Sequence, residues 1–330
     1  MKNKIRVAML GMGGMGFEHA GNMLKMEDVE IVAMCSATGG GDRFNAEKGL
    51  NIPVYSDFDE MLDKVEMDAL YVCLPPFAHN GQIEKAAAKK IAVFTEKPIA
   101  INVERAESIA KAVRENGVVS MVGYHMRFGG AVKHVRKLME EGITGRPIMY
   151  TAIYECNSLH TPWWIKRELC GGQVFEQVIH LYDMAYYIMG EVDTVAGFVE
   201  KLSHEDVPEY TVDDSSAVSL KFKGKAMGSI VGSNCSVPGR WVGRFKIIFE
   251  NCVAEFGNEN NVTITYTKGE VRSETLKFDT PAKLDETRYF IDVLKGEKPE
   301  FTPIEDGLMG VRLVDAAVRS SEAGGMPIKF

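Results

Sequence analysis

The feature that most constrains this chain is a glycine-rich hexapeptide, GMGGMG, at residues 11–16. It directly follows the short apolar run 5–10 and precedes a stretch of helical character that extends to about residue 25. A strand, a G-x-G-x-x-G loop and a helix in this order are typical of the phosphate-binding turn of a dinucleotide site. The opening segment therefore predicts a parallel α/β domain that binds a dinucleotide.

The glycines of this loop meet separate physical demands. Gly11 permits a tight turn, Gly13 lets a pyrophosphate approach the backbone, and Gly16 lets the helix pack close to the strand. The phosphates lie at the helix N-terminus, where free N–H groups and the helix dipole attract negative charge. The alternatives are a plain glycine turn, a P-loop and a kinase loop, and the last two fit less well because no Lys-Ser/Thr, HRD or DFG sequence follows. The cofactor-binding residues predicted here are Gly11, Gly13, Gly14, Met15 and Gly16.

The remainder of the first 123 residues alternates between strand and helix signals. Strands are expected over 30–35, 69–73, 91–95 and 118–122, with helices near 82–89 and 103–115 between the later ones. The strand segments are almost fully apolar, as expected for a parallel sheet that is covered on both faces. We predict a doubly wound Rossmann domain over residues 1–123.

After Gly123 the pattern changes. Helices are expected near 131–141 and 174–189, and the intervening and following strands alternate apolar and polar residues with short turns between them, which indicates antiparallel pairing. Two helices, near 284–294 and 305–323, close the chain. We predict an α+β domain with a large open, mainly antiparallel sheet over residues 124–330. The fold class is therefore α/β, with a Rossmann domain followed by this second domain.

Composition excludes several classes of function. The 46 acidic residues exceed the 38 basic ones, for a formal net charge of −8, which argues against binding to nucleic acid or to an anionic membrane. Apolar runs are too short to span a bilayer, and the start of the chain lacks the apolar core of a secretory signal. The six cysteines form no CxxC pair and are interpreted as reduced thiols of a cytoplasmic protein, not as a zinc site.

The end of the second predicted strand bears on the choice of cofactor. An NAD site usually places Asp or Glu there to bind the ribose 2′-hydroxyl. Here Ser36 follows the strand, Thr38 comes next but one, and Arg43 follows a glycine run. A carboxylate at this position would repel the 2′-phosphate of NADP. Because the sequence has none there, these residues favour NADP slightly over NAD. An inward-folded Asp42 and a solvated Arg43 would instead leave NAD as the cofactor.

Two further segments follow predicted strands at the sheet edge where ligands bind. Lys97, in the sequence Glu96-Lys97-Pro98, places an ammonium where it can hold a substrate hydroxyl and stabilise an alkoxide. An exposed charged turn is the plain alternative. The other segment contributes Leu74, Pro75 and His79 to the predicted cofactor crevice, together with Glu96 and Lys97. A residue at the start of a helix is the plain alternative for His79.

The predicted helix 174–189 carries three charged or titratable residues on a mostly apolar background. Glu176, His180 and Asp183 are spaced i, i+4, i+7, so an α-helix would place them on one face. His180 is the natural general base because imidazole titrates near neutrality, and Glu176 is positioned to orient it. A structural hydrogen-bonded cluster and a metal site built from these three residues are the alternatives. We predict no metal.

Several segments together resemble the glucose–fructose oxidoreductase, inositol dehydrogenase and rhizopine catabolism (Gfo/Idh/MocA) family along the whole chain. The matching segments are GMGGMG at 11–16, DALYVCLPPFAH at 68–79, TEKP at 95–98, VGYHMRF at 122–128, residues 171–183 and EDGL at 305–308. The sequence differs at three positions: Glu176 replaces an Asp, Gln173 replaces a third glycine, and Ser36 replaces the usual acid.

The resemblance implies NAD(P)-linked oxidation or reduction of a sugar, sugar derivative or cyclitol at a secondary hydroxyl or keto group. It implies catalytic roles for Lys97 and His180 at that hydroxyl, with Glu176 in support. It also implies a homodimer or homotetramer formed through the second sheet. The substrate-binding residues that we predict with it are Lys97, Tyr124, Arg127, Trp163, Trp164, His180 and Asp183. Core or dimer packing is the alternative for the two tryptophans.

Three other functions are compatible with such a fold. A sensor would bind a dinucleotide without turnover, although it would have no need of a base. A glycoside-cleaving enzyme would hold NAD tightly and oxidise its sugar only transiently. An imine or pyrrole-type reductase would not need His180. Fold alone does not separate these functions.

Overall fold

The computed structural model describes residues 4–159 and 161–330, which divide into two compact units. Unit 1 contains the residues up to Gly123 together with Lys283–Leu308, and unit 2 contains Tyr124–Ala282 and Met309–Phe330. The break at Gly123 lies where the sequence pattern changes. The predicted second domain, residues 124–330, differs from unit 2 because Lys283–Leu308 returns to unit 1, where Phe290 packs its ring 5.5 Å from that of Tyr71.

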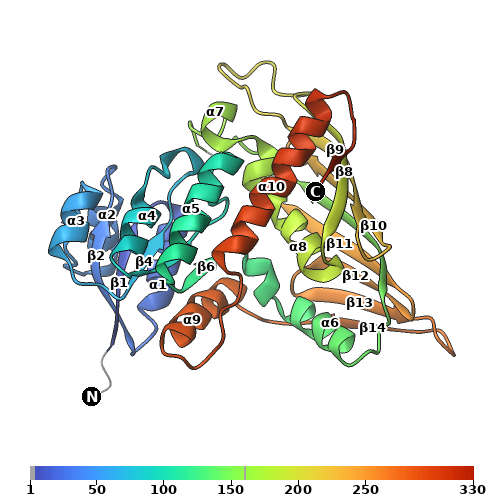
Figure 1. Cartoon of the computed structure of the whole chain (residues 1–330), viewed down its shortest axis with the longest axis horizontal. Coiled ribbons are helices and arrows are strands. Elements are labelled where there is room, and N and C mark those ends of the chain that lie inside the picture. Colours follow the sequence, from blue (N-terminus) through green and yellow to red (C-terminus); the bar gives the residue numbers. More distant parts are fainter. Residues whose placement is uncertain (1–3, 160) are drawn as a thin grey trace. The chain divides into compact units, whose positions relative to one another are not determined.

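Unit 1 is built on a six-stranded parallel sheet in the order β3-β2-β1-β4-β5-β6 (Figure 1). The order reverses between β1 and β4, and in such sheets ligands bind beyond the carboxyl ends of the strands at that point. The predicted Rossmann topology is confirmed. Its strands are β1 (Ile5–Leu10), β2 (Val29–Cys35), β3 (Val54–Tyr55), β4 (Ala69–Val72), β5 (Ala92–Thr95) and β6 (Ser120–Val122).

The helices of unit 1 begin where local sequence favours it. The side chain of Asp57 accepts a hydrogen bond from the Glu60 N–H at the start of α3, and Asn102 accepts one from the Arg105 N–H at the start of α5. Such caps satisfy N–H groups that the helix itself leaves unpaired. The helices are α1 (Gly14–Met23), α2 (Gly40–Lys48), α3 (Phe58–Lys64), the 3₁₀ turn η1 (Pro76–Ala78), α4 (Gln82–Ala88), α5 (Val103–Asn116) and α9 (Ala282–Leu294).

Unit 2 is built on a nine-stranded sheet in the order β14-β13-β12-β11-β7-β10-β9-β8-β15. Strands β7 and β10 pair in parallel, and the other neighbours are antiparallel. The predicted open, mainly antiparallel sheet is therefore confirmed. The strands are β7 (Pro147–Glu155), β8 (Val192–Glu200), β9 (Ser215–Phe222), β10 (Met227–Ser233), β11 (Val242–Phe249), β12 (Cys252–Asn258), β13 (Asn261–Tyr266), β14 (Arg272–Lys277) and β15 (Ile328–Lys329).

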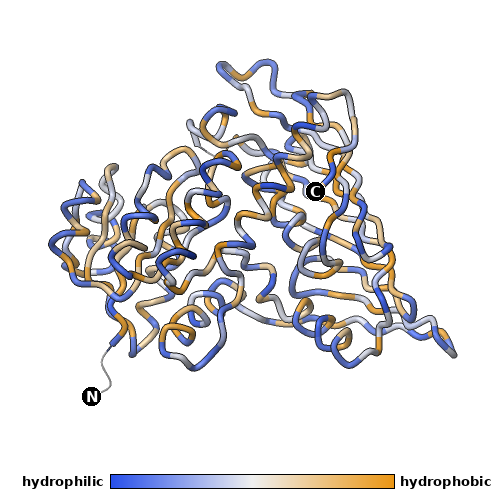
Figure 2. Tube along the Cα trace, viewed as in Figure 1, coloured by the Kyte–Doolittle hydropathy of each residue, from blue (hydrophilic) through white to orange (hydrophobic). Residues whose placement is uncertain are grey.

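Helices cover one face of this sheet (Figure 1). Helix α8 packs on β7 and β10, and α6 packs on β13 and β14. In β9, buried residues alternate with exposed ones, as expected when only one face is covered. Figure 2 colours the trace by hydropathy and shows hydrophilic and hydrophobic residues interspersed along the strands of unit 2. The helical segments of unit 2 are η2 (His125–Phe128), α6 (Gly130–Glu140), α7 (Arg167–Cys170), η3 (Val174–Val178), α8 (Ile179–Met189) and the greater part of α10 (Ile304–Glu322).

The predicted helix over 174–189 is not uniform. Its first turn, η3, is a π-helix, and α8 continues from Ile179. Short π-helical turns are rare and frequently occur at functional sites. In the described part of the chain, no helix is both long and apolar enough to cross a membrane.

Candidate active site

The glycine loop of unit 1 is tightly packed against its neighbours. A Cβ atom on Gly11, whose φ is +88°, would lie 2.5 Å from the Cys73 carbonyl oxygen beyond β4. A Cβ on Gly16 would lie 2.2 Å from the Gly11 oxygen, and one on Gly40 would lie 2.2 Å from the Met12 oxygen. Glycine is therefore required for steric reasons at Gly11 and Gly16 in the loop and at Gly40, which packs against the loop from the start of α2.

The start of α1 has a different character. Gly13 is its N-cap and provides no side-chain cap, so the N–H groups of the first turn, including those of Gly14 and Met15, depend on other acceptors. A Cβ on Gly13 or Gly14 would meet no described atom within 4 Å beyond its chain neighbours. A pyrophosphate can therefore approach this backbone and accept from these N–H groups. The residues present fit a dinucleotide.

The residues beyond β2 have partners of their own. The Ser36 Oγ accepts a hydrogen bond of 3.0 Å from the N–H of Gly40, the first residue of α2, and its own O–H is still able to donate to a ligand. The Arg43 guanidinium lies 4.6 Å from the centroid of the Phe17 ring and 3.8 Å from a Glu47 carboxylate oxygen. Thr38 is exposed. Their predicted contact with a 2′-phosphate stays a prediction.

The segment after β4 places its residues differently. Leu74 lies beside the glycine loop, with its Cδ2 atom 3.2 Å from where a Gly11 Cβ would be, and Pro75 precedes η1. His79 is buried, and its backbone carbonyl accepts a 2.9 Å hydrogen bond from Arg105 Nε. Burial lowers the pKa of His79 to about 4, so its ring is neutral at pH 7.

The segment Glu96-Lys97-Pro98 follows β5 and contains a cis peptide bond before the proline. The Glu96 carboxylate is turned into unit 1, where Oε1 lies 2.9 Å from His19 Nε2 and Oε2 accepts a 3.2 Å hydrogen bond from the Lys97 N–H. His19 was not singled out by sequence reasoning. The only sequence signal for His19 was its position on the helix that follows the glycine loop. The roles predicted for Glu96 and Lys97 stay predictions.

In unit 2, His180 is buried on α8 among aromatic rings. The centroid of the His125 ring lies 4.7 Å from that of His180, edge to face, and the Tyr124 ring lies 6.4 Å away. Sequence reasoning named Tyr124 but missed His125, although both belong to the VGYHMRF segment. An imidazole that lies beside a tyrosine ring and a second imidazole can act as a proton acceptor.

Glu176 lies in the π-helical turn η3 and contacts the tryptophan segment. The Trp164 indole N–H donates a 3.1 Å hydrogen bond to Glu176 Oε2. Burial raises the pKa of Tyr154, and the nearby charge of Glu176 raises it further, which places this tyrosine of β7 close to the same carboxylate. The predicted orientation of His180 by Glu176 stays a prediction.

The third residue of the predicted face, Asp183, faces a buried cation. Arg127 Nε donates a 3.0 Å hydrogen bond to Asp183 Oδ2, and Nη2 pairs with Oδ1. The Arg127 guanidinium also lies 4.5 Å from the centroid of the Tyr187 ring and 5.7 Å from that of Tyr124. This buried ion pair gives both side chains a structural role. Their predicted substrate contacts stay predictions.

The tryptophans differ in exposure. Trp164 is buried with Cys170, Tyr210 and Val212, whereas Trp163 is half-buried against this cluster. Trp164 thus packs in the core, whereas Trp163 retains exposed surface, and the predicted substrate contacts of both stay predictions.

Among the described residues, only one group of three or more potential metal ligands has its ligand atoms within 4.8 Å of one another. This group consists of His19, Glu96 and Glu286. The set Glu176, His180 and Asp183, considered as a metal site from its spacing, is not brought together in this way. All six cysteines are free, and burial raises the thiol pKa of Cys35, Cys156 and Cys252 to about 11.

Comparison with known proteins decides the family. Residues 5–124 match the model of an oxidoreductase family with an NAD-binding Rossmann fold, GFO_IDH_MocA, and residues 132–272 match the GFO/IDH/MocA C-terminal domain. The chain belongs to the GFO/IDH/MocA family. Its members therefore supply the relevant comparisons for both units.

Two relatives within this family align over almost their entire length. The scyllo-inositol 2-dehydrogenase (NAD(+)) of Bacillus subtilis is 27% identical, covering 100% of this chain and 97% of that protein. The myo-inositol 2-dehydrogenase of Thermotoga maritima is 27% identical, covering 96% of each. The solved structure of levoglucosan dehydrogenase with NADH and levoglucosan has a TM-score of 0.88 at 18% identity, covering 99% of both chains, and supports the fold.

Proposed function

We propose that this protein is an NAD(P)-dependent oxidoreductase that transfers a hydride between nicotinamide and a secondary hydroxyl or keto group of a sugar, sugar derivative or cyclitol. The observation that carries the proposal is the buried His180 beside His125 and Tyr124, on a chain whose glycine loop fits a dinucleotide. The full-length similarity to two inositol 2-dehydrogenases supports the substrate class.

The chemistry assigns a separate task to each residue. Nicotinamide, when bound at the glycine loop, would supply the acceptor for the hydride of the carbinol carbon. His180 accepts the hydroxyl proton, so the alcohol becomes a carbonyl and the imidazole becomes an imidazolium. A positive charge on one of two adjacent imidazoles disfavours a positive charge on the other. The Lys97 ammonium stabilises the negative charge that develops on the oxygen.

The remaining polar residues act through position. Trp164 holds the Glu176 carboxylate by its indole N–H, and that carboxylate stabilises positive charge formed nearby on α8. Tyr124, Arg127, Trp163, Trp164 and Asp183 are the proposed substrate-contact residues, of which Trp163 has the more exposed ring for stacking on the C–H face of a sugar.

The test is reduction of NAD⁺ and NADP⁺, followed at 340 nm, with a panel of cyclitols and pyranoses that includes scyllo- and myo-inositol. We expect turnover with at least one of them, and we expect H180N to lose about 10²- to 10⁴-fold in kcat. H134Q, which replaces a half-buried histidine of α6, is the matched control and should retain activity. Turnover that survives H180N unchanged would overturn the base assignment.

We propose further that the cofactor is NADP in preference to NAD. The support comes from the hydroxyls of Ser36 and Thr38, the exposed Arg43 and the absence of a carboxylate directly after β2. A 2′-phosphate carries charge that an arginine neutralises. Titration with NADPH and NADH, read by fluorescence, should show tighter NADPH binding that R43A weakens without affecting NADH. Tighter NADH binding would refute this preference.

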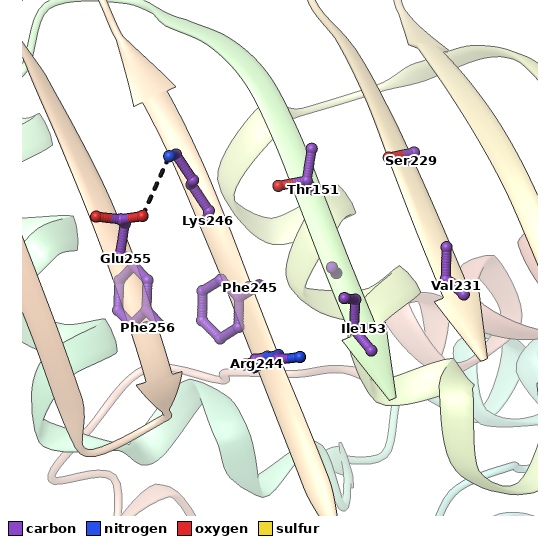
Figure 3. A pocket seen from close by; sticks show the side chains of 10 residues that line it. Thr151, Ile153, Ser229, Val231, Arg244, Phe245, Lys246, Glu255 and Phe256 are labelled. Carbon is purple, nitrogen blue, oxygen red and sulfur yellow. Dashed lines mark hydrogen bonds and ion pairs between the residues drawn. The ribbon is translucent and has the colours of Figure 1, made fainter. Parts of the chain in front are cut away.

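The open face of the unit 2 sheet is the proposed surface for a homodimer or homotetramer. It has a hollow of about 310 Å³ between β7, β10, β11 and β12, where the Lys246 ammonium pairs with Glu255 at 3.1 Å (Figure 3). Met227 and Val231, on β10, are 56% and 42% exposed on this face. A second copy would cover these apolar side chains. Light scattering should show a multimer that V231E converts to monomer, and a wild-type monomer would refute the proposal.

We also propose a cytoplasmic location. All six cysteines are free, and reduced thiols are usual in that compartment. Fractionation of cells that express the full chain tests this proposal, and recovery with the membrane or in the medium would refute it.

A further inference from the structure

A buried chain of hydrogen bonds in unit 1 connects α9 to the turn that carries Lys97. Thr287 Oγ1 lies 2.9 Å from His19 Nδ1, and His19 Nε2 lies 2.9 Å from Glu96 Oε1. The other oxygen of Glu96 accepts a 3.2 Å hydrogen bond from the Lys97 N–H. The side chains of Thr287, His19 and Glu96 are all buried, so solvent does not compete for these contacts.

The donors in this chain can be counted. Thr287 donates its single hydroxyl proton to the Lys283 carbonyl oxygen at 2.8 Å, so it can only accept from His19. His19 Nδ1 therefore carries a proton. Its Nε2 faces a carboxylate oxygen, and two acceptors at 2.9 Å would repel each other. A second proton must lie between Nε2 and Glu96.

We propose that His19 is a positioning residue that, through its buried hydrogen bond to Glu96, holds the Glu96–Pro98 turn and thereby the Lys97 ammonium in place. This inference rests on the role proposed above for Lys97. Helix α9 takes part because Thr287 fixes the orientation of the ring.

Two substitutions of His19 separate its two contacts. In H19Q the amide reaches the position of Nε2 and can donate to Glu96, whereas in H19N the shorter amide reaches only the position of Nδ1. We expect H19N to lower kcat about 10- to 100-fold, because small displacements of a catalytic group carry costs of this size. H19Q should lose less, and the KM for the polyol should change little in either variant.

The hydrogen bond to Glu96 is tested on the full chain labelled with ¹⁵N-histidine. We expect the NMR signal of His19 Nε2 to shift in E96Q, which replaces the partner carboxylate by an amide. H19N identifies the His19 signals by their disappearance. A spectrum that E96Q leaves unchanged would overturn the proposal.

The placement of Lys97 is tested without turnover. The rate at which acetic anhydride acetylates Lys97, followed by peptide mass spectrometry, should change in H19N and return toward the wild-type rate in H19Q, with exposed Lys48 as internal reference. Absence of polyol oxidation by the wild type would refute the proposed function but leave both measurements valid. Unchanged Lys97 acetylation in H19N, confirmed as folded by thermal melting, would refute the positioning role.

Discussion

Replacing Asp183 by Asn should destabilise the protein, not merely weaken substrate binding. Arg127 and Asp183 are 4% and 2% exposed, and their contact is bidentate. Removing one partner of a buried ion pair leaves an uncompensated charge and costs about 3–5 kcal/mol. The rings of Tyr124 and Tyr187 stay beside the guanidinium in the variant, so they do not offset this loss.

The expected change is large enough to measure by thermal unfolding. At about 2–4 °C per kcal/mol for a domain of this size, D183N should lower Tm by about 6 to 20 °C. The double variant R127M/D183L is the control, because replacing a whole buried pair by apolar residues is often close to neutral. It should recover most of the lost stability. If D183N melts with the wild type while the KM for substrate rises, the structural interpretation is wrong and the predicted substrate contact is favoured.

Three further outcomes are expected. G16A should weaken NAD(P)H binding in fluorescence titrations by about tenfold or more, because its Cβ would lie 2.2 Å from the Gly11 oxygen. On the same helix, a Cβ on Gly21 would meet no described atom within 4 Å apart from the adjacent backbone of that helix, so G21A should bind normally and gain up to about 1 kcal/mol in helix propensity. Burial raises the pKa of Asp213 to about 7, so the native state holds this proton more tightly than the unfolded chain, and stability from this group should fall as pH rises from about 4 to about 7. D213N should flatten that part of the Tm–pH curve, and an identical curve would count against it. Burial lowers the pKa of His79 to about 4, so stability present above about pH 6.5 should be lost as pH falls toward 4, and H79Q should reduce that acid sensitivity in the same assay.

The Rossmann topology could be predicted because its determinants are local. The glycine loop, the apolar strands and the intervening helices each lie within a short stretch, and parallel strands joined through helices leave few arrangements. The mainly antiparallel second sheet followed from alternating residues and short turns for the same reason. No local sequence signal indicated that Lys283–Leu308 packs in unit 1. That packing depends on which apolar surface α9 contacts in the folded protein.

The helix that carries His180 shows where the prediction reached its limit. Regular α-helical spacing would place Glu176, His180 and Asp183 on one face. The structure instead has a π-helical turn at Glu176, pairs Asp183 with Arg127 from η2, and brings His125 to His180. Helix type and side-chain partners depend on residues about 50 positions away.

The sequence by itself thus determined which residues are capable of the chemistry: a glycine loop for phosphates, a lysine beyond a strand and a histidine on an apolar helix. Only the tertiary structure decided what each of them touches. It showed that Glu96 faces His19, that Trp164 binds Glu176, and that Asp183 is held by Arg127. The physical reason is that composition and local spacing set propensity and charge, whereas hydrogen bonds between buried side chains form only where packing brings distant segments within about 3 Å of one another.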